Sequence, residues 1–240
     1  MTGLRDYYEP DCDVIDLSST LKEGEEKIID IVNLKRNKPL KIIGKIILKD
    51  RAKLTIVEVD FAKFDVDFLL DVECIGYKSE FWYHLSSLNR DDEKKIYKAN
   101  VVHKGKESFS RTSMFGVCEG SSQMQFLGAS DIRKGAAKTN TRQEAKIVNL
   151  SGKARCVASP ALLISEEDVF ASHGASMGSV PDNDIFYLMS RGIDRSTANK
   201  LIMVGYLKPI ALKIKDEKIK EEALDLLGKE IWRSLYHKKR

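Results

Sequence analysis

The 240-residue sequence predicts a mainly β protein that ends in a small α-helical region. Short clusters of β-branched and aromatic residues recur from Val14 onward, and charged or turn-forming residues separate them. Several clusters alternate between apolar and polar residues, as in the stretch 55–59. Beyond residue 181, the apolar residues recur at helical spacing instead. These observations predict an N-terminal arm (1–13), a β domain (14–180) and a C-terminal helical region (181–240).

The predicted strands of the first half are the clusters at residues 28–32, 40–48, 54–59, 66–72 and 81–85. The pattern continues from residue 94 to residue 158, where the turns become richer in Gly, Ser, Thr and Ala. The runs 108–113 and 121–126 alternate as strands with one outward face do. Such spacing fits a sandwich, a barrel or a β-solenoid, and periodicity alone does not separate the three.

The first predicted helix contains the run IFYLMSR. Asp182, Asn183 or Asp184 can cap its N-terminus, and Gly192 can end it in a left-handed conformation.

A second helix can be capped by Asp194 or Ser196 and is expected to end near Pro209. A third is predicted from about residue 216 to residue 236, because its leucines and isoleucine fall on one stripe. These three helices form the predicted appendage.

Composition excludes several classes of protein. Hydrophobic residues make up 42% of the chain and charged residues 32%, as in ordinary soluble proteins. The net charge of +4 is too weak to indicate a nucleic-acid partner. No apolar run is long enough to cross a membrane, and the first residues lack the apolar core of a signal peptide. We therefore expect a cytoplasmic protein with neither a nucleic-acid nor a membrane partner.

The four cysteines lie far apart and form no C-x-x-C pair, so reduced thiols are expected rather than a disulfide framework. The sequence has no G-x-x-x-x-G-K-[ST], no G-x-S-x-G and no H-E-x-x-H. We therefore expect no nucleotide bound by this chain and no enzymatic activity. His84 is expected to be structural, and His237 to be solvated in the basic C-terminal end.

The stretch from 159 to 192 is the most informative part of the sequence. His173 lies in a strand-like passage, ASHGASMG, with Gly, Ala or Ser on both sides. Such neighbours leave the imidazole little cover from its own strand, so a partner surface or a ligand is expected beside it. The alternative is that His173 is a hydrogen-bonded structural residue.

Six features follow one another in a fixed order here: a proline, an LLI strand, a Glu-Glu-Asp turn, the ASHGAS passage, the DNDIFYLMSRGI helix and the segment 198–205. This order resembles the C-terminal signature of the SufB/SufD family of iron–sulfur cluster assembly proteins, and more closely its SufD branch. The resemblance covers roughly residues 100–210. It implies a right-handed parallel β-helix, and residues 138–150 are similar to the rung that precedes the signature.

The resemblance also implies a non-catalytic scaffold subunit of a SUF-type complex. Its partners would be a SufB-like subunit, or a second copy of the chain, and a SufC-like ATPase of the ABC type. The cofactor implied is a transient iron–sulfur cluster held where two scaffold subunits meet.

Within that resemblance, His173 is the expected iron or cluster ligand, facing a cysteine of the partner. The SufB branch carries Glu directly after this histidine and Cys 28 residues before it, whereas this chain has Gly174 and Ala145. A complete SufB-type site is therefore not encoded. Cys118 and Cys156 are further candidate ligands, or small apolar core residues.

Five residues of the first predicted helix form the candidate docking surface for the ATPase: Phe186, Tyr187, Met189, Arg191 and Gly192. Aromatic residues, Met and Arg are enriched at the centres of interfaces. The alternative is that the aromatic pair covers the end of the β domain.

Two other functions are possible for such a sequence. One is a protein-interaction module without cluster chemistry. The other is a solenoid enzyme acting on polysaccharide or an acyl group with His173 as base, although no cluster of acidic, Lys or Arg residues stands next to His173.

Overall fold

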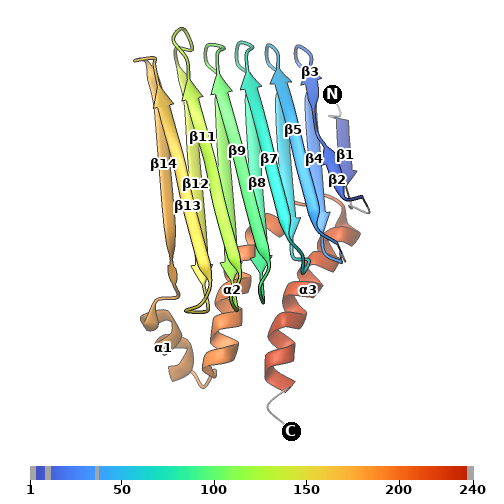
Figure 1. The fold of residues 1–240 in the computed structure, drawn as a ribbon, viewed down its shortest axis with the longest axis vertical. Coiled ribbons are helices and arrows are strands. Elements are labelled where there is room, and N and C mark those ends of the chain that lie inside the picture. The colour runs from blue at the N-terminus through green and yellow to red at the C-terminus, as the bar shows by residue number, and fades with distance from the viewer. Residues whose placement is uncertain (1–3, 9–11, 36–37, 237–240) are drawn as a thin grey trace.

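In the computed structural model, which describes residues 4–8, 12–35 and 38–236, the strands form two facing sheets and the helices gather at one end of them (Figure 1). The first sheet has the order β1 (Leu4–Tyr8), β4 (Glu26–Asn33), β6 (Lys53–Asp60), β8 (Glu80–Asn89), β10 (Phe109–Cys118), β12 (Thr139–Asn149) and β14 (Val169–Ser179). The second has the order β13 (Arg155–Ile164), β11 (Gln123–Ile132), β9 (Lys94–His103), β7 (Val66–Cys74), β5 (Leu40–Leu48) and β2 (Val14–Asp16), with β3 (Ser19–Leu21) also on β5.

From β4 onward, consecutive strands alternate between the two sheets, and every pairing is parallel. Residues one turn apart are separated by 27 positions for Asn33 and Asp60, and by 31 for Ser108 and Thr139. A chain that returns to the same sheet at this interval is a parallel β-helix, so that prediction is confirmed and neither a sandwich nor a barrel is formed. The β1 strand pairs with β4, so residues 4–8 of the predicted arm lie against the solenoid.

The turns that lead into β4, β6, β8, β10 and β12 repeat one backbone conformation. Gly24, Arg51, Lys78, Glu107 and Lys138 all have positive φ angles, between 54° and 66°. Each donates its backbone N–H to a carbonyl of the next turn, at 2.6 to 3.0 Å. This hydrogen bond offsets the cost of placing a non-glycine residue in the left-handed region.

The inward side chains of both sheets form the main core. Phe68 stacks on Tyr83 with ring centroids 5.1 Å apart, and Tyr97 packs edge-on against Phe126. Charged groups also enter this interior. Lys95 and Asp60 are fully buried and form an ion pair of 3.2 Å, which Tyr97 completes by donating to Asp60.

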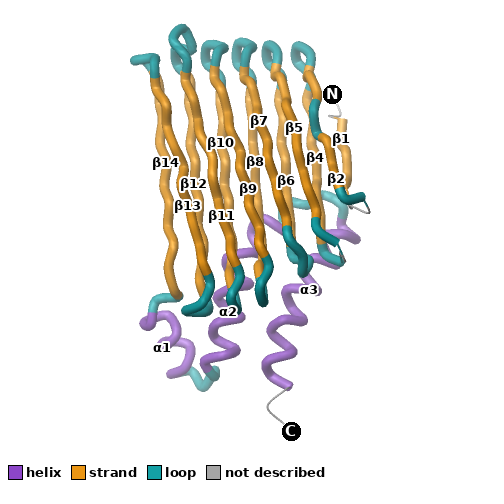
Figure 2. The backbone as a smooth tube through the Cα atoms, viewed as in Figure 1, coloured by secondary structure: helices purple, strands orange, loops and turns teal. Residues whose placement is uncertain are grey.

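A second core lies between the first sheet and the helices, whose backbones lie near the lower ends of the strands in Figure 2. The helices are α1 (Asp182–Ser190), α2 (Arg195–Ala211) and α3 (Glu217–Tyr236). Outward residues near the ends of the even-numbered strands, such as Val59 and Leu88, pack with buried α2 residues such as Leu207. The Ser86 hydroxyl also donates to the Leu207 carbonyl at 3.0 Å. The α2 helix is thereby fixed on β8 and β10.

The start of α1 corrects one detail of the sequence analysis. Pro181 occupies the N-cap of α1, so Asp182 and Asp184 lie in the first turn, where their charges favour the helix dipole without capping it. The α2 helix ends at Ala211, two residues after Pro209, as predicted.

The Asp194 cap and the left-handed conformation of Gly192 are confirmed. Asp194 caps α2 by accepting from the N–H groups of Ser196 and Thr197, and Gly192 has a φ of 83° after α1. No helix within the described residues is long and apolar enough to cross a membrane. His237 lies outside the described residues.

Candidate functional site

The β13 and β14 strands form the last turn of the solenoid, at one end of the row of strands in Figure 1. In the part of the chain that the structure describes, each of these strands is paired along one edge only. Most side chains of β14 are exposed, including Phe170 at 71% and Met177 at 49%. We call this last turn the open end.

His173 lies on the inward row of β14, over the edge of the interior. It is paired in register with Gln143 of β12, and residues paired in this way point to the same side of a sheet. Gln143 points inward, because Ala145 and Ile147, two and four residues further on, belong to the main core. No strand is stacked beyond β14 within the described residues, so the His173 side chain is exposed.

A network of hydrogen-bonded hydroxyl groups inside the solenoid connects His103 with Gln143, the residue paired with His173. His103 is hydrogen-bonded through Nε2 to Ser110, and Ser110 to Thr141, at 2.9 and 2.7 Å. Thr141 is bonded to Ser130 at 3.0 Å, and Gln143 donates its amide N–H to Ser130 at 2.7 Å. These bonds fix the residue directly beneath His173.

Sequence reasoning missed this network, although Ser and Thr alternating along β10 and β12 were its signal. Burial lowers the pKa of His103 to about 4, so its imidazole is neutral at physiological pH.

The outward side of β14 has a different character. A cavity of about 480 Å³ opens there beside Gly174, and no atom beyond the adjoining residues lies within 4 Å of the position that a Cβ of Gly174 would take. Arg142, Glu144 and Lys146 of β12 line it with charged side chains. Gln143 and His173 also line this cavity, so the small residues around His173 leave open space beside it.

The two candidate cysteines lie together but away from His173. The thiols of Cys118 and Cys156 are hydrogen-bonded to each other. This hydrogen bond, and then burial, raise the pKa of Cys118, and the same hydrogen bond lowers the pKa of Cys156. Cys118 is level with Ser179 through the strand pairings, six residues beyond His173. At the rise of a β-strand this is about 20 Å. No group of three or more His, Cys, Asp or Glu that could hold a metal occurs among the described residues.

Phe186, Tyr187 and Met189 lie on the short, solvent-facing α1 helix, and the other two candidate docking residues, Arg191 and Gly192, directly follow its end. Phe186 and Tyr187 are 74% and 58% exposed, and Arg191 lies over the Tyr187 ring at 5.2 Å. Ile185 is the buried residue of α1 and packs into the second core. The aromatic pair therefore does not cover the end of the β domain.

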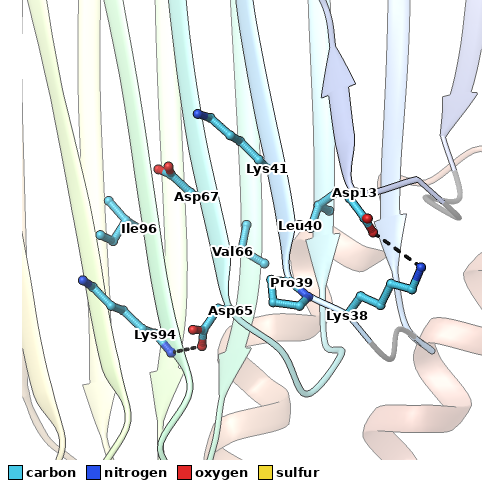
Figure 3. Close-up of a pocket in the computed structure, with 10 residues that line it drawn as sticks. All are labelled: Asp13, Lys38, Pro39, Leu40, Lys41, Asp65, Val66, Asp67, Lys94 and Ile96. Atoms are coloured by element: carbon cyan, nitrogen blue, oxygen red, sulfur yellow. Dashed lines mark hydrogen bonds and ion pairs between the residues drawn. The ribbon is translucent and has the colours of Figure 1, made fainter.

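A further cavity of about 580 Å³ lies on the outer face of the second sheet, near the other end of the solenoid (Figure 3). Both lysine and aspartate side chains line it, and some of them interact with each other or with the backbone. Lys38 lies 3.9 Å from Asp13, and the backbone N–H of Lys94 donates to Asp65 at 2.8 Å. The cavity is far along the sheet from β13 and β14, so it is not part of the open end.

Comparisons with known proteins agree with this architecture. Residues 27–206 match the family described as "SUF system FeS cluster assembly, SufBD core domain". The chain is 35% identical over 144 residues to the iron–sulfur cluster assembly protein SufD of Bacillus subtilis, and 30% identical over 106 residues to SufD of Escherichia coli. These matches cover 60% and 44% of this chain, but only 33% and 25% of the two relatives.

A SufBD family protein of Pyrococcus horikoshii is 35% identical over 75 residues, which cover 31% of this chain and 17% of that protein. The chain thus spans about a third or less of the curated relatives it matches.

Proposed function

Because the chain belongs to the SufB/SufD family and is SufD-like, we propose that it is a non-catalytic scaffold subunit of a SUF-type iron–sulfur cluster assembly complex. In this proposal the open end pairs with a SufB-like subunit or with a second copy of the chain. The helices dock a SufC-like ABC-type ATPase, and the iron–sulfur cluster is the cargo assembled between the subunits.

The open end is the observation that carries the proposal. Exposed strand edges with apolar side chains are a liability in a protein that stays alone, because they invite pairing with another chain. On β13, Val157, Leu163 and Ile164 are exposed, in addition to Phe170 and Met177 of β14. A partner that adds strands to both edges would cover the inward Met177 and Ile164 and continue the solenoid. The outward Phe170, Val157 and Leu163 would lie beside the new strands at the boundary between the two chains.

His173 supplies one ligand to the cluster in this proposal. An exposed imidazole can bind iron, but one residue does not hold a cluster. Because Cys118 lies about 20 Å away along the strand, the remaining ligands come from the partner. The fixed Gln143 beneath His173 would keep the imidazole at the subunit boundary.

The α1 helix is the proposed docking surface for the ATPase. Its exposed Phe186 and Tyr187, with Arg191 over the Tyr187 ring, form the aromatic and guanidinium combination that dominates many interface centres. The chain itself would bind no nucleotide.

A protein-interaction module without cluster chemistry is the second candidate. The lack of a three-ligand group within the described residues favours it, since such a module needs only the open end and the helices.

The test is co-expression with the cell's SufB-like and SufC-like proteins, followed by purification through this chain and measurement of stoichiometry and iron. We expect both partners to be recovered with iron. His173→Ala should lower the iron while both partners are retained, and Ser172→Ala, on the outward face of the same strand, should leave it unchanged.

Arg191→Glu should lose the ATPase alone, whereas Lys98→Glu, exposed on the second sheet, should retain it. Full iron and full cluster assembly with His173→Ala would refute the cluster role and leave the interaction module. Recovery of the chain without either partner would refute the scaffold assignment.

A further inference from the structure

A third cavity, of about 500 Å³, lies on the outer face of the first sheet, where α2 ends. Two rows of neighbouring side chains form its floor. Trp82 of β8 is in register with Arg111 of β10, and His84 with Ser113. Ser113 is in turn paired with Glu144 of β12.

The cavity wall comes from the end of α2 and the residues after it, which include Lys213. With Thr55 of β6, four strands and a helix line this cavity. None of its lining residues belongs to the open end, although Glu144 also lines the cavity beside Gly174.

The charges of this cavity are not matched by partners. Arg111 is half-exposed and Lys213 is exposed. Within the described part of the chain, neither of them forms an ion pair, and nor does Glu144. Two cations thus face one carboxylate. Burial, and then the charges of Lys213 and Arg111, lower the pKa of His84 to about 4, so the imidazole adds no charge at physiological pH. The cavity keeps a surplus of one positive charge.

The His84 side chain in this cavity also has a buried nitrogen atom without a hydrogen-bond partner. The residue is 8% exposed, and its Nδ1 atom is buried without a hydrogen bond. Buried polar atoms almost always find a partner, and the exceptions call for an explanation such as a missing ion or ligand. The centroid of the Trp82 ring lies 6.2 Å from that of the His84 imidazole and 4.7 Å from that of the Phe109 ring. One wall of the cavity is therefore aromatic and lies next to the two cations.

The C-terminal end of α2 also borders this cavity, and the negative end of a helix dipole repels an anion unless its carbonyl groups are satisfied. The negative end of a helix dipole comes from its last carbonyl groups. Four of the last five carbonyls of α2 already accept hydrogen bonds, from Ser86, Leu212, Lys213 and Ile214. Most of the carbonyl groups at this helix end are therefore already satisfied.

We propose that this cavity binds a small organic oxyanion, with its phosphate or carboxylate oxygens on Arg111 and Lys213 and its apolar body against Trp82. Arg and Lys are the residues that bind such oxygens, and pockets for small molecules combine apolar and aromatic walls with a few convergent polar groups. A bound oxyanion also offsets the two cations that disfavour a charged His84. The inference does not depend on the proposed scaffold function.

The test uses the full chain and two probes, phenyl phosphate and benzoate, with binding measured by calorimetry at low ionic strength. Arg111→Gln and Lys213→Gln should each weaken binding about tenfold or more, because each removes a charge-assisted hydrogen bond. Lys98→Gln removes one positive charge from the opposite sheet and should bind as the natural chain does. Both pocket residues are at least partly exposed, so these variants should fold.

The His84 ring supplies a second readout. In the chain with ¹⁵N-labelled histidine, the His84 signals should shift on saturation with the probe, while those of His103 should not. Binding of phenyl phosphate alone assigns a phosphate group, binding of benzoate alone a carboxylate, and binding of both a less selective site. Binding of neither probe, or an equal loss with Lys98→Gln, would overturn the proposal.

Discussion

Glu58 is a buried carboxyl group whose replacement should make the protein more stable at neutral and alkaline pH. The residue points into the interior of the solenoid, where Tyr83 donates its hydroxyl to Oε2 at 2.6 Å. Burial raises the pKa of Glu58 to about 8, against a lowering by the Tyr83 hydrogen bond. Asp60 raises the pKa further, and Lys95 lowers it. In Glu58→Gln, the amide oxygen can still accept from Tyr83, and nothing titrates.

The sign and size of the effect follow from proton linkage. Below pH 4.5 both the folded and the unfolded chain carry the proton, so Glu58 contributes no pH dependence. Between pH 4.5 and about 8 only the folded chain keeps it, and the free energy of unfolding falls by about 1.4 kcal/mol per pH unit. The loss is about 3 kcal/mol at pH 7 and about 5 kcal/mol above pH 8. The Gln variant lacks this loss.

The assay is urea unfolding followed by circular dichroism at pH 5 and pH 8. The advantage of Glu58→Gln over the natural chain should be under about 1 kcal/mol at pH 5 and several kcal/mol at pH 8. His84 and His103 titrate in both proteins, so their contributions cancel. Glu26→Gln, an exposed carboxyl on β4, should show no such change. The same gap between variant and natural chain at the two pH values would refute the reasoning, because a change in packing alone does not depend on pH.

Three further substitutions test other parts of the structure. Lys95→Met should lower the free energy of unfolding by about 3 to 5 kcal/mol, because it leaves the buried Asp60 carboxylate without its cation. Urea unfolding measures this change, and a loss below about 1 kcal/mol would contradict the reasoning. Asp194→Ala should cost about 1 kcal/mol in the same measurement, since two N–H groups of the first turn of α2 lose their acceptor, and an unchanged midpoint would show that the cap does not matter. Gly76→Ala should lower the thermal midpoint strongly, because a Cβ there would lie 2.0 Å from the backbone of the preceding turn, whereas Gly152→Ala, with open space around it, should change it little.

The strands and helices were predictable because their signals are local. The cluster predicted at 40–48 coincides with β5, and the third helix begins at Glu217 as its pattern indicates. How the strands pair is not local. A residue such as Thr55 meets Ile28 and Trp82, each 27 positions away, and alternation within one strand carries no information on that distance. Only the resemblance to a known family distinguished a solenoid from a sandwich or a barrel.

The candidate site was predictable in part for the same reason. The sequence indicated that His173 has small neighbours, and the structure shows it exposed at the open end. The placement of Cys118 beside Cys156, and away from His173, depends on the strand register and was not predictable from spacing. The unmatched charges around His84 were missed as well, because Arg111 and Lys213 are 102 residues apart and meet only when α2 packs on the first sheet.

The turns at Arg51, Lys78, Glu107 and Lys138 share one backbone conformation and one hydrogen bond to the next turn, so this part of the solenoid consists of equivalent, evenly spaced repeats. These turns present the same hydrogen-bonding groups to one another, so a whole turn of this kind can be gained or lost in evolution at little cost to its neighbours. The α2 helix packs on β8 and β10, and β14 is two strands further along the sheet, or about 10 Å. A duplicated turn between them would leave the helices and the open end chemically unchanged and set them about 5 Å further apart. Chain length in this region therefore specifies the spacing between two surfaces, and selection can adjust that spacing in discrete steps.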